Sequence, residues 1–174
     1  MNASTPSVVF PPTPIVAVGS DWLDSLKRLA LAADNKRARV CLHQDERSAV
    51  QQMLIVFHRS TFIGPHRQKR QFKSYTVLHG QLSVSFFDDV GNMTEHQLLG
   101  EIATRNHFLL RFPASRWHMA VPVTEWTVFI ETAEGPFMPA STEYAPWGPD
   151  YRNPAEVKAF LDRINMTERN MSQD

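Results

Sequence analysis

Two histidines occupy positions where folding could bring their imidazoles together. His66 lies in the polar run Gly64-Pro65-His66-Arg67-Gln68, and His118 follows a turn that begins at Pro113. If the chain is extended from Gly64, His66 and Gln68 project to one side, because side chains alternate along a strand. Closing a β-barrel can place an early strand beside a late one. We therefore predict that His66 and His118 face a shared interior pocket.

A lysine and two aromatic residues follow at alternating positions. Lys73, Tyr75 and His79 share one face of the next predicted strand. On that face Lys73 could be a functional cation of the pocket. A lysine whose stem packs inside while its head reaches the barrel mouth is the open alternative for Lys73.

A third group of candidates lies upstream, between Arg37 and His43. Arg37 and Arg39 could bind a phosphate or a carboxylate, although paired arginines on a strand also suit a surface. We predict a ligand-binding role for five residues: Gln68, His79, His118, Arg39 and His43. Cys41 is the only cysteine, so it cannot form an internal disulfide, and we expect it to pack as a small hydrophobe.

Short runs of alternating residues between Arg37 and about Glu134 predict the strands that would position these side chains. The runs are Val50–His58, Phe72–His79, Gln81–Asp88, Met93–Leu99, His107–Phe112, Trp117–Val123 and Glu125–Thr132. Many short strands with no helix among them are typical of a sandwich or a barrel. Residues 88–92 predict a hairpin turn, with Gly91 or Asn92 at positive φ.

A helix is predicted on each side of the strands. Ser20 is the expected N-cap of a helix that runs to about Ala33, and Asn153-Pro154-Ala155-Glu156 is typical of the start of a second helix. We predict three parts: an irregular arm over residues 1–19 with a short strand at Ser7–Phe10, one domain over residues 20–165, and a frayed tail over residues 166–174.

The composition argues against several classes of partner. Eighteen basic residues balance eighteen acidic ones, so no electrostatic footprint for nucleic acid or an anionic membrane is evident. The first residues lack the basic segment of a secretory signal, and no stretch approaches the roughly 20 apolar residues of a membrane span. We expect a soluble cytoplasmic protein that binds a small molecule and forms a homodimer, with Ser7–Phe10 as a candidate swapped strand.

Several segments together resemble a known family. Gly64 to Gln68 followed by Lys73 to Gly80 resembles the first cupin motif, and Pro113 to His118 resembles the second. The fuller resemblance is to the WbuC family of cupin-fold proteins, found with surface-polysaccharide genes. It extends over residues 37–43, 50–53, 86–89, 131–137 and 145–149. The resemblance implies a mainly β, cupin-type double-stranded β-helix (jelly-roll) barrel with an N-terminal and a C-terminal helix.

The chain departs from the metal motif that this resemblance implies. The family's second histidine is Gln68 here, its glutamate is Lys73, and the asparagine of an upstream segment is Cys41. The metal ligands would be His66 and His118, with Gln68 as a candidate third. An ammonium about 4 Å from a dication costs about 8 kcal/mol at an effective dielectric constant near 20. We therefore predict no tightly bound metal; the alternative is a divalent ion such as zinc, iron, manganese or nickel.

The leading functional hypothesis is a WbuC-like protein that binds a small polar metabolite, such as a sugar or nucleotide sugar, around His66, Lys73 and His118. One alternative is a metal-dependent cupin enzyme, an oxygenase or isomerase. Another is a non-catalytic module that senses a ligand or mediates assembly. The spacing from Lys73 to Gly80 also resembles that in cupin-fold dTDP-sugar epimerases, which implies epimerase- or isomerase-like chemistry if the protein is an enzyme. By that resemblance, His66 would remove a proton beside a ketone and Lys73 would stabilise the developing oxyanion. Tyr75 or His79 would then donate a proton.

Overall fold

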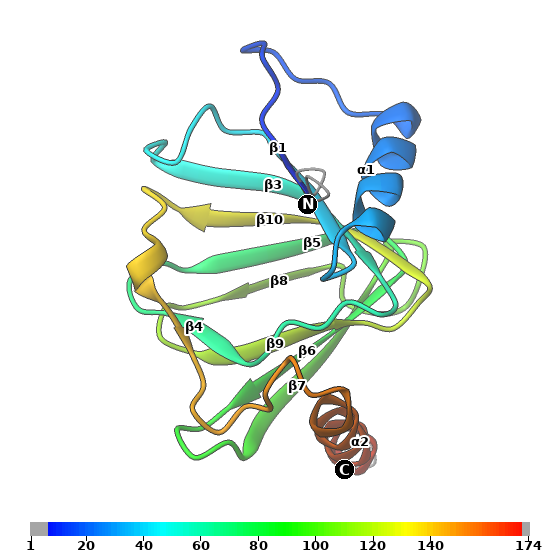
Figure 1. Ribbon diagram of the computed structural model, residues 1–174, viewed down its shortest axis with the longest axis vertical. Coiled ribbons are helices and arrows are strands. Elements are labelled where there is room, and N and C mark those ends of the chain that lie inside the picture. Colours follow the sequence, from blue (N-terminus) through cyan, green and yellow to red (C-terminus); the bar gives the residue numbers. More distant parts are fainter. Residues whose placement is uncertain (1–6, 172–174) are drawn as a thin grey trace.

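The strands of the computed structural model, which describes residues 7–171, form two facing sheets (Figure 1). The large sheet has six strands in the order β1 (Val8–Val9), β2 (Arg37–Cys41), β3 (Val50–His58), β10 (Trp126–Glu134), β5 (Lys73–His79) and β8 (Leu109–Phe112). The small sheet has five strands in the order β11 (Thr142–Tyr144), β4 (His66–Gln68), β9 (Trp117–Pro122), β6 (Gln81–Phe87) and β7 (Met93–Gly100). The predicted mainly β architecture is confirmed.

Apolar side chains that alternate inward fill much of the space between the sheets. Aromatic rings dominate this core, and Phe57 meets Phe129 edge to face with ring centroids 5.0 Å apart. Its buried members are Cys41, Met53, Ile55, Phe57, Tyr75, Val77, Leu82, Val84, Phe86, Leu99, Phe112, Ala120 and Phe129. Because inward residues come from both sheets, packing in this core holds the two sheets against each other.

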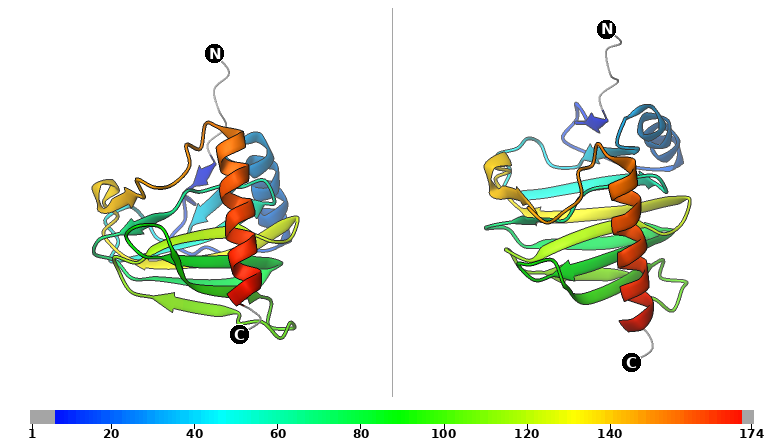
Figure 2. Two further views of the ribbon diagram at one scale, coloured as in Figure 1. Left: turned by 90° about the horizontal axis from the view of Figure 1, so that it is seen from below. Right: turned by 60° about the horizontal axis from the view of Figure 1, so that its bottom comes forward.

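Helix α1 (Ser20–Ala32) covers the outer face of the large sheet (Figures 1 and 2). Leu26 and Ala30 are fully buried there, against apolar residues of β2, β3 and β10. The helix begins at Ser20 and the N-cap position is Gly19, whose backbone is extended. The prediction of Ser20 as the N-cap is therefore wrong by one residue.

Helix α2 (Pro154–Met171) lies on the outer face of the small sheet (Figure 2). Phe160 and Ile164 pack against buried residues of β6 and β9. The helix continues through part of the predicted frayed tail, because Glu168 accepts hydrogen bonds of 2.8 Å from the hydroxyls of Ser83 and Ser85. Residues 172–174 of that tail lie outside the described residues. No helix within residues 7–171 combines the length and apolar composition that crossing a membrane requires.

The arm and the turns agree with the sequence in part. The strand expected at Ser7–Phe10 is reduced to Val8–Val9, which pairs in parallel with β2 of the same chain. Its exchange between two copies stays a prediction, and residues 1–6 lie outside the description. Gly91 has the predicted positive φ, at 90°, in the turn between β6 and β7. Strand β11 follows a short 3-10 helix, Pro139–Ser141, in a proline-rich stretch where no strand was predicted.

Candidate functional site

A cavity of about 280 Å³ lies between the two sheets and combines a polar wall with an apolar floor. The large sheet contributes the charged residues Arg37, Arg39, Lys73, Glu131 and Glu134. The small sheet contributes His66, Gln68 and Tyr144, and Phe10 of the arm also lines the cavity. Most apolar lining residues come from β3, β9 and β10, and they include Met53, Ile55, Phe57, Ala120, Phe129 and Ala133. This volume is close to the lower limit for small-molecule pockets in proteins.

The two predicted histidines do meet, through direct pairing of β4 with β9. His66 is the cross-strand neighbour of His118, and their ring centroids are 4.4 Å apart. His118 is only 1% exposed and lies behind His66, with its ring 4.7 Å from that of Phe112. His118 is not among the residues that line the cavity. The predicted convergence of the imidazoles is therefore confirmed, but only His66 faces the space where a ligand would lie.

Both imidazoles are neutral and have the same tautomer. Nδ1 of His66 lies 3.0 Å from the Gly64 carbonyl, and Nδ1 of His118 lies 2.9 Å from the Arg116 carbonyl. A carbonyl only accepts hydrogen bonds, so each Nδ1 carries the proton and each Nε2 carries a lone pair. Burial, and then the charge of Lys73, lowers the pKa of His66 to about 4. Burial and the neighbouring His66 hold the pKa of His118 well below its ordinary value.

Lys73 has a carboxylate partner inside the barrel. Its Nζ lies 3.2 Å from Oε1 of Glu131, and the two side chains are 6% and 14% exposed. Sequence reasoning missed Glu131, although it lies between the apolar residues Phe129 and Ala133 on the inward face of β10. Tyr75 lies beside the pair, opposite Glu131 in the strand register. Burial raises the pKa of Tyr75 well above its ordinary value, so the phenol keeps its proton.

Arg37 and Arg39 lie together on β2 and face the cavity. Both are partly buried, and neither forms an ion pair with a carboxylate anywhere within residues 7–171. Nε of Arg39 is buried with no hydrogen-bond partner, although its guanidinium is near the Cys41 thiol. Burial, and then repulsion by Arg39, lowers the pKa of Arg37. The prediction that Arg39 lines the pocket is supported by its position.

The remaining polar lining residues include two more predicted positions. Oε1 of Gln68 is buried and has no hydrogen-bond partner in the described part of the chain. The His43 ring lines the cavity beside Phe10, with ring centroids 5.7 Å apart, and its Nδ1 is within hydrogen-bond distance of the Gln52 backbone. Gln68 is thus an acceptor with spare capacity, whereas Nδ1 of His43 is already engaged.

His79 lies outside the site, contrary to the alternation argument. The register of β5 against β10 shifts between Val77 and His79, so Leu78 is an extra residue that bulges from the strand. A bulge interrupts the alternation of side chains, and a residue beyond it need not share the face of those before it. The His79 side chain is 57% exposed, and its Nδ1 lies 3.0 Å from Glu101. The inward position predicted for His79 is wrong.

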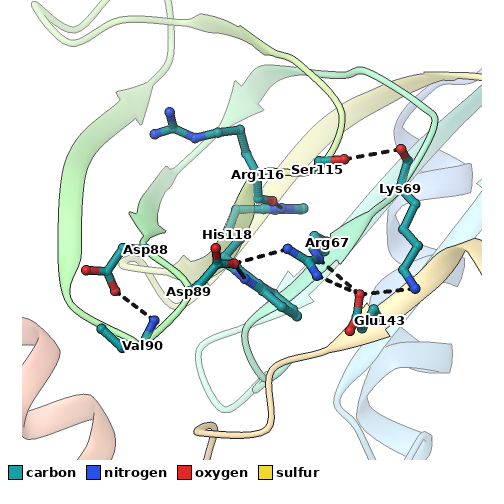
Figure 3. A network of polar contacts seen from close by, with 10 residues as sticks. Arg67, Lys69, Asp88, Asp89, Val90, Ser115, Arg116, His118 and Glu143 are labelled. Carbon is teal, nitrogen blue, oxygen red and sulfur yellow. Dashed lines mark hydrogen bonds and ion pairs between the residues drawn. The ribbon is translucent and has the colours of Figure 1, made fainter.

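The orientation of β4 is fixed from its outer side by a network around Arg67 (Figure 3). Arg67 makes ion pairs of 3.2 Å with Asp89 and 3.0 Å with Glu143, and its guanidinium lies 4.1 Å from the Trp117 ring centre. Nε1 of Trp117 donates a hydrogen bond to Asp89 as well. Because neighbouring residues of a strand point to opposite sides, holding Arg67 outside directs His66 and Gln68 inward.

The residues present do not form a suitable site for a tightly bound divalent metal. The tautomers of His66 and His118 would suit a metal, since each has its Nε2 lone pair free of a protein donor. Nevertheless, residues 7–171 contain no group of three or more histidine, cysteine, aspartate or glutamate side chains that could hold an ion. Two imidazoles and the Gln68 amide are a weak set, and Glu131 is committed to Lys73, whose charge opposes a cation.

Comparison with solved structures identifies the class of fold. Oxalate oxidase in complex with the substrate analogue glycolate matches with 12% identity and a TM-score of 0.51, over 66% of this chain and 57% of that chain. A protein from Shewanella oneidensis matches with 13% identity and a TM-score of 0.48, over 56% of this chain and 63% of that chain. The fold is therefore of the cupin type, as the sequence predicted.

Two further comparisons use sequence alone. A family model described as a domain of unknown function, DUF6016, matches residues 18–99, just under half of the chain. No curated protein matches the chain. The chain spans less than two thirds of the length of the solved structures named above. At such low identities the likeness concerns the fold, and the site has to be interpreted from its own residues.

Proposed function

We propose that this protein is a WbuC-like cupin that binds a small polar metabolite, a sugar or nucleotide sugar of surface-polysaccharide metabolism, without a tightly bound metal. The ligand would occupy the cavity between the sheets. Its hydroxyl groups would donate to Nε2 of His66 and to Oε1 of Gln68, two acceptors on neighbouring inward positions of β4. Its less polar face would rest on the side chains of β3 and β10.

The observation that carries this proposal is the unused hydrogen-bonding capacity of the cavity wall. Oε1 of Gln68 and Nε of Arg39 are both buried without a partner among residues 7–171. A buried polar atom without a partner costs about 1–3 kcal/mol, and native proteins satisfy most such atoms. Two of them on the wall of one cavity are explained if a polar ligand supplies the missing partners.

Binding is better supported than catalysis by the ionisation of the site. A general base works best when its pKa is near the operating pH, whereas burial holds the pKa of His66 near 4. The ion pair with Glu131 offsets the positive charge of Lys73, so Lys73 would stabilise a developing oxyanion less well than an unpaired ammonium would. An epimerase-like proton transfer to His66 would therefore require that ligand binding first raises the pKa of His66 or separates Lys73 from Glu131.

Isothermal titration calorimetry with glucose, UDP-glucose and dTDP-glucose tests the proposal. We expect at least one of these probes to bind at one site per chain. Gln68→Leu should weaken that binding about tenfold, because a hydrogen bond inside the cavity is lost. Gln97→Leu, on β7 and outside the cavity, is the matched control and should bind as the wild type does. Absence of binding by all three probes, or equal binding by both variants, contradicts the proposal.

A further inference from the structure

Arg37 and Arg39 differ from the other cations near the barrel interior. Lys73, also on the cavity wall, is paired with Glu131, and Arg67, on the outer side of β4, is paired with Asp89 and Glu143. Arg37 and Arg39 project to the same side of β2 and have no carboxylate partner in the described part of the chain. The two other acidic residues that line the cavity, Glu46 and Glu134, are both exposed. The inner wall around β2 therefore carries two guanidiniums without a direct ion pair, although the Glu131 carboxylate favours the charge of Arg37 from a distance.

We propose that Arg37 and Arg39 form an anion-binding subsite that holds the terminal phosphate or carboxylate of a hydroxylated ligand. The inference rests on the proposed function and narrows its ligand to an anion. Guanidinium groups bind these anions through paired charge-assisted hydrogen bonds, and two of them can share one anionic group. The buried Nε of Arg39 is one donor that such an anion would satisfy.

The other residues that line the cavity indicate the chemistry and size of the rest of the ligand. His66 and Gln68 present acceptors to the space beyond the arginines, and they require hydroxyl donors. The volume of about 280 Å³ suits a ligand of monosaccharide size. A sugar monophosphate and a sugar acid share this chemistry, because each joins one anionic group to several hydroxyls. We take these two as the candidate sources of the anion.

The arrangement is unfavourable in the free protein. Two partly buried guanidiniums on one strand repel each other, and burial alone already disfavours the charge of Arg37. An anion relieves both the repulsion and the loss of hydration. Removing either arginine should therefore weaken ligand binding without destabilising the free protein, which is the pattern expected of residues kept for binding.

The test uses calorimetry and thermal unfolding with four probes: glucose 1-phosphate, glucuronate, inorganic phosphate and glucose. We expect glucose 1-phosphate or glucuronate to bind the wild type more tightly than glucose does, and to raise its unfolding temperature. Whichever binds identifies the anion as phosphate or carboxylate. Arg37→Met and Arg39→Met should each weaken that binding on the order of 10- to 100-fold. Arg28→Met, which removes an exposed arginine of α1, is the matched control and should change nothing.

Two additional measurements cover variants that fail to fold. Arg37→Lys and Arg39→Lys keep the charge but lose the paired donors, so binding should weaken less than in the methionine variants. For the wild type, raising NaCl from about 0.05 M to about 0.5 M should weaken binding of the anion and leave glucose unaffected.

The outcomes separate this inference from the proposed function. If a sugar or nucleotide sugar binds and Gln68→Leu weakens it, but neither arginine variant does, the proposed function stands and the anion subsite is wrong. If no probe binds to the wild type, including inorganic phosphate, both are wrong. Binding of inorganic phosphate that both methionine variants abolish supports the subsite by itself.

Discussion

Two clusters of charged residues, one on the outer face of the small sheet and one in the cavity between the sheets, are built differently. Outside, Arg67 lies between two carboxylates and over the Trp117 ring. Inside, Arg37 and Arg39 lie near each other without an ion pair within residues 7–171, whereas Lys73 is paired with Glu131. All three arginines are on strands and partly buried. Burial alone therefore does not explain why one arginine is paired and two are not.

The difference separates residues that hold the fold from residues kept for a ligand. The Arg67 cluster joins β4 to the β6–β7 turn and to β11, so its pairing is completed by the chain itself. The cavity cluster leaves donors and acceptors unused, which is unfavourable until a ligand supplies partners. The variants below test this contrast, from the largest expected effect to the smallest.

Lys73→Met should have the largest effect on stability. The substitution leaves the Glu131 carboxylate buried without its cation, and the free energy of unfolding should fall by about 3 kcal/mol. The double variant Lys73→Met/Glu131→Leu should recover most of this loss, because both charges are removed together. Urea denaturation followed by tryptophan fluorescence measures both. A single variant as stable as the wild type would show that the pair is not buried as described.

Acid should destabilise the protein through His66. The pKa of His66 is about 4 in the folded protein and about 6.5 in the unfolded chain, so the unfolded state binds more protons between these values. The free energy of unfolding should therefore fall by up to about 3 kcal/mol as the pH drops from 6.5 towards 4, and this contribution is fully present above 6.5.

Denaturation curves measured across this pH range for the wild type and for His66→Gln isolate the effect. The variant has no imidazole at this position, so its stability should decline less steeply with acid. Parallel declines for the two proteins would mean that His66 titrates normally and is open to water.

Arg67→Met should lower the free energy of unfolding by about 1–2 kcal/mol. The variant loses two ion pairs and the contact with the Trp117 ring, although the Arg67 side chain is 25% exposed and water screens part of the effect. Thermal unfolding measures the change, with exposed Arg152→Met as the control, since Arg152 pairs only with Asp150 in the described chain. An effect no larger than that of the control would remove the contrast between the clusters.

Arg37→Met should have the smallest effect, and of opposite sign. Its removal ends the repulsion by Arg39 and the cost of burying its own charge, so the ligand-free protein should be unchanged or more stable by about 1 kcal/mol. The same thermal unfolding experiment, without ligand, compares Arg37→Met with Arg67→Met. A loss of stability as large as that of Arg67→Met would assign Arg37 a structural role.

Much of the fold could be predicted from the sequence because alternation records burial directly. Strand β3 is observed at Val50–His58, as predicted, since its inward residues Met53, Ile55 and Phe57 are apolar and bulky. Strand β4 has only three polar residues, and β11 follows prolines, so neither has the pattern of a buried strand. Both strands form by pairing with neighbouring strands, so their positions depend on residues elsewhere in the chain.

The site could be predicted only in part for the same reason. His66, Gln68, Lys73 and Arg39 line the cavity as predicted because each strand is regular around them. His79 does not line the cavity, because the bulge at Leu78 arises from pairing with β10 and cannot be recognised in the alternating sequence pattern. The ion pair of Lys73 could not be predicted either, because Glu131 is on β10, far from Lys73 in sequence.

Calorimetric titration of EDTA-treated protein with glucose 1-phosphate and with glucuronate tests the central claim most directly. The cavity wall already supplies cations and acceptors, so we predict that one of the two binds at one site per chain, with the same affinity before and after chelation. Binding that vanishes with EDTA and returns with zinc or manganese, or the absence of binding by both compounds, would contradict the account.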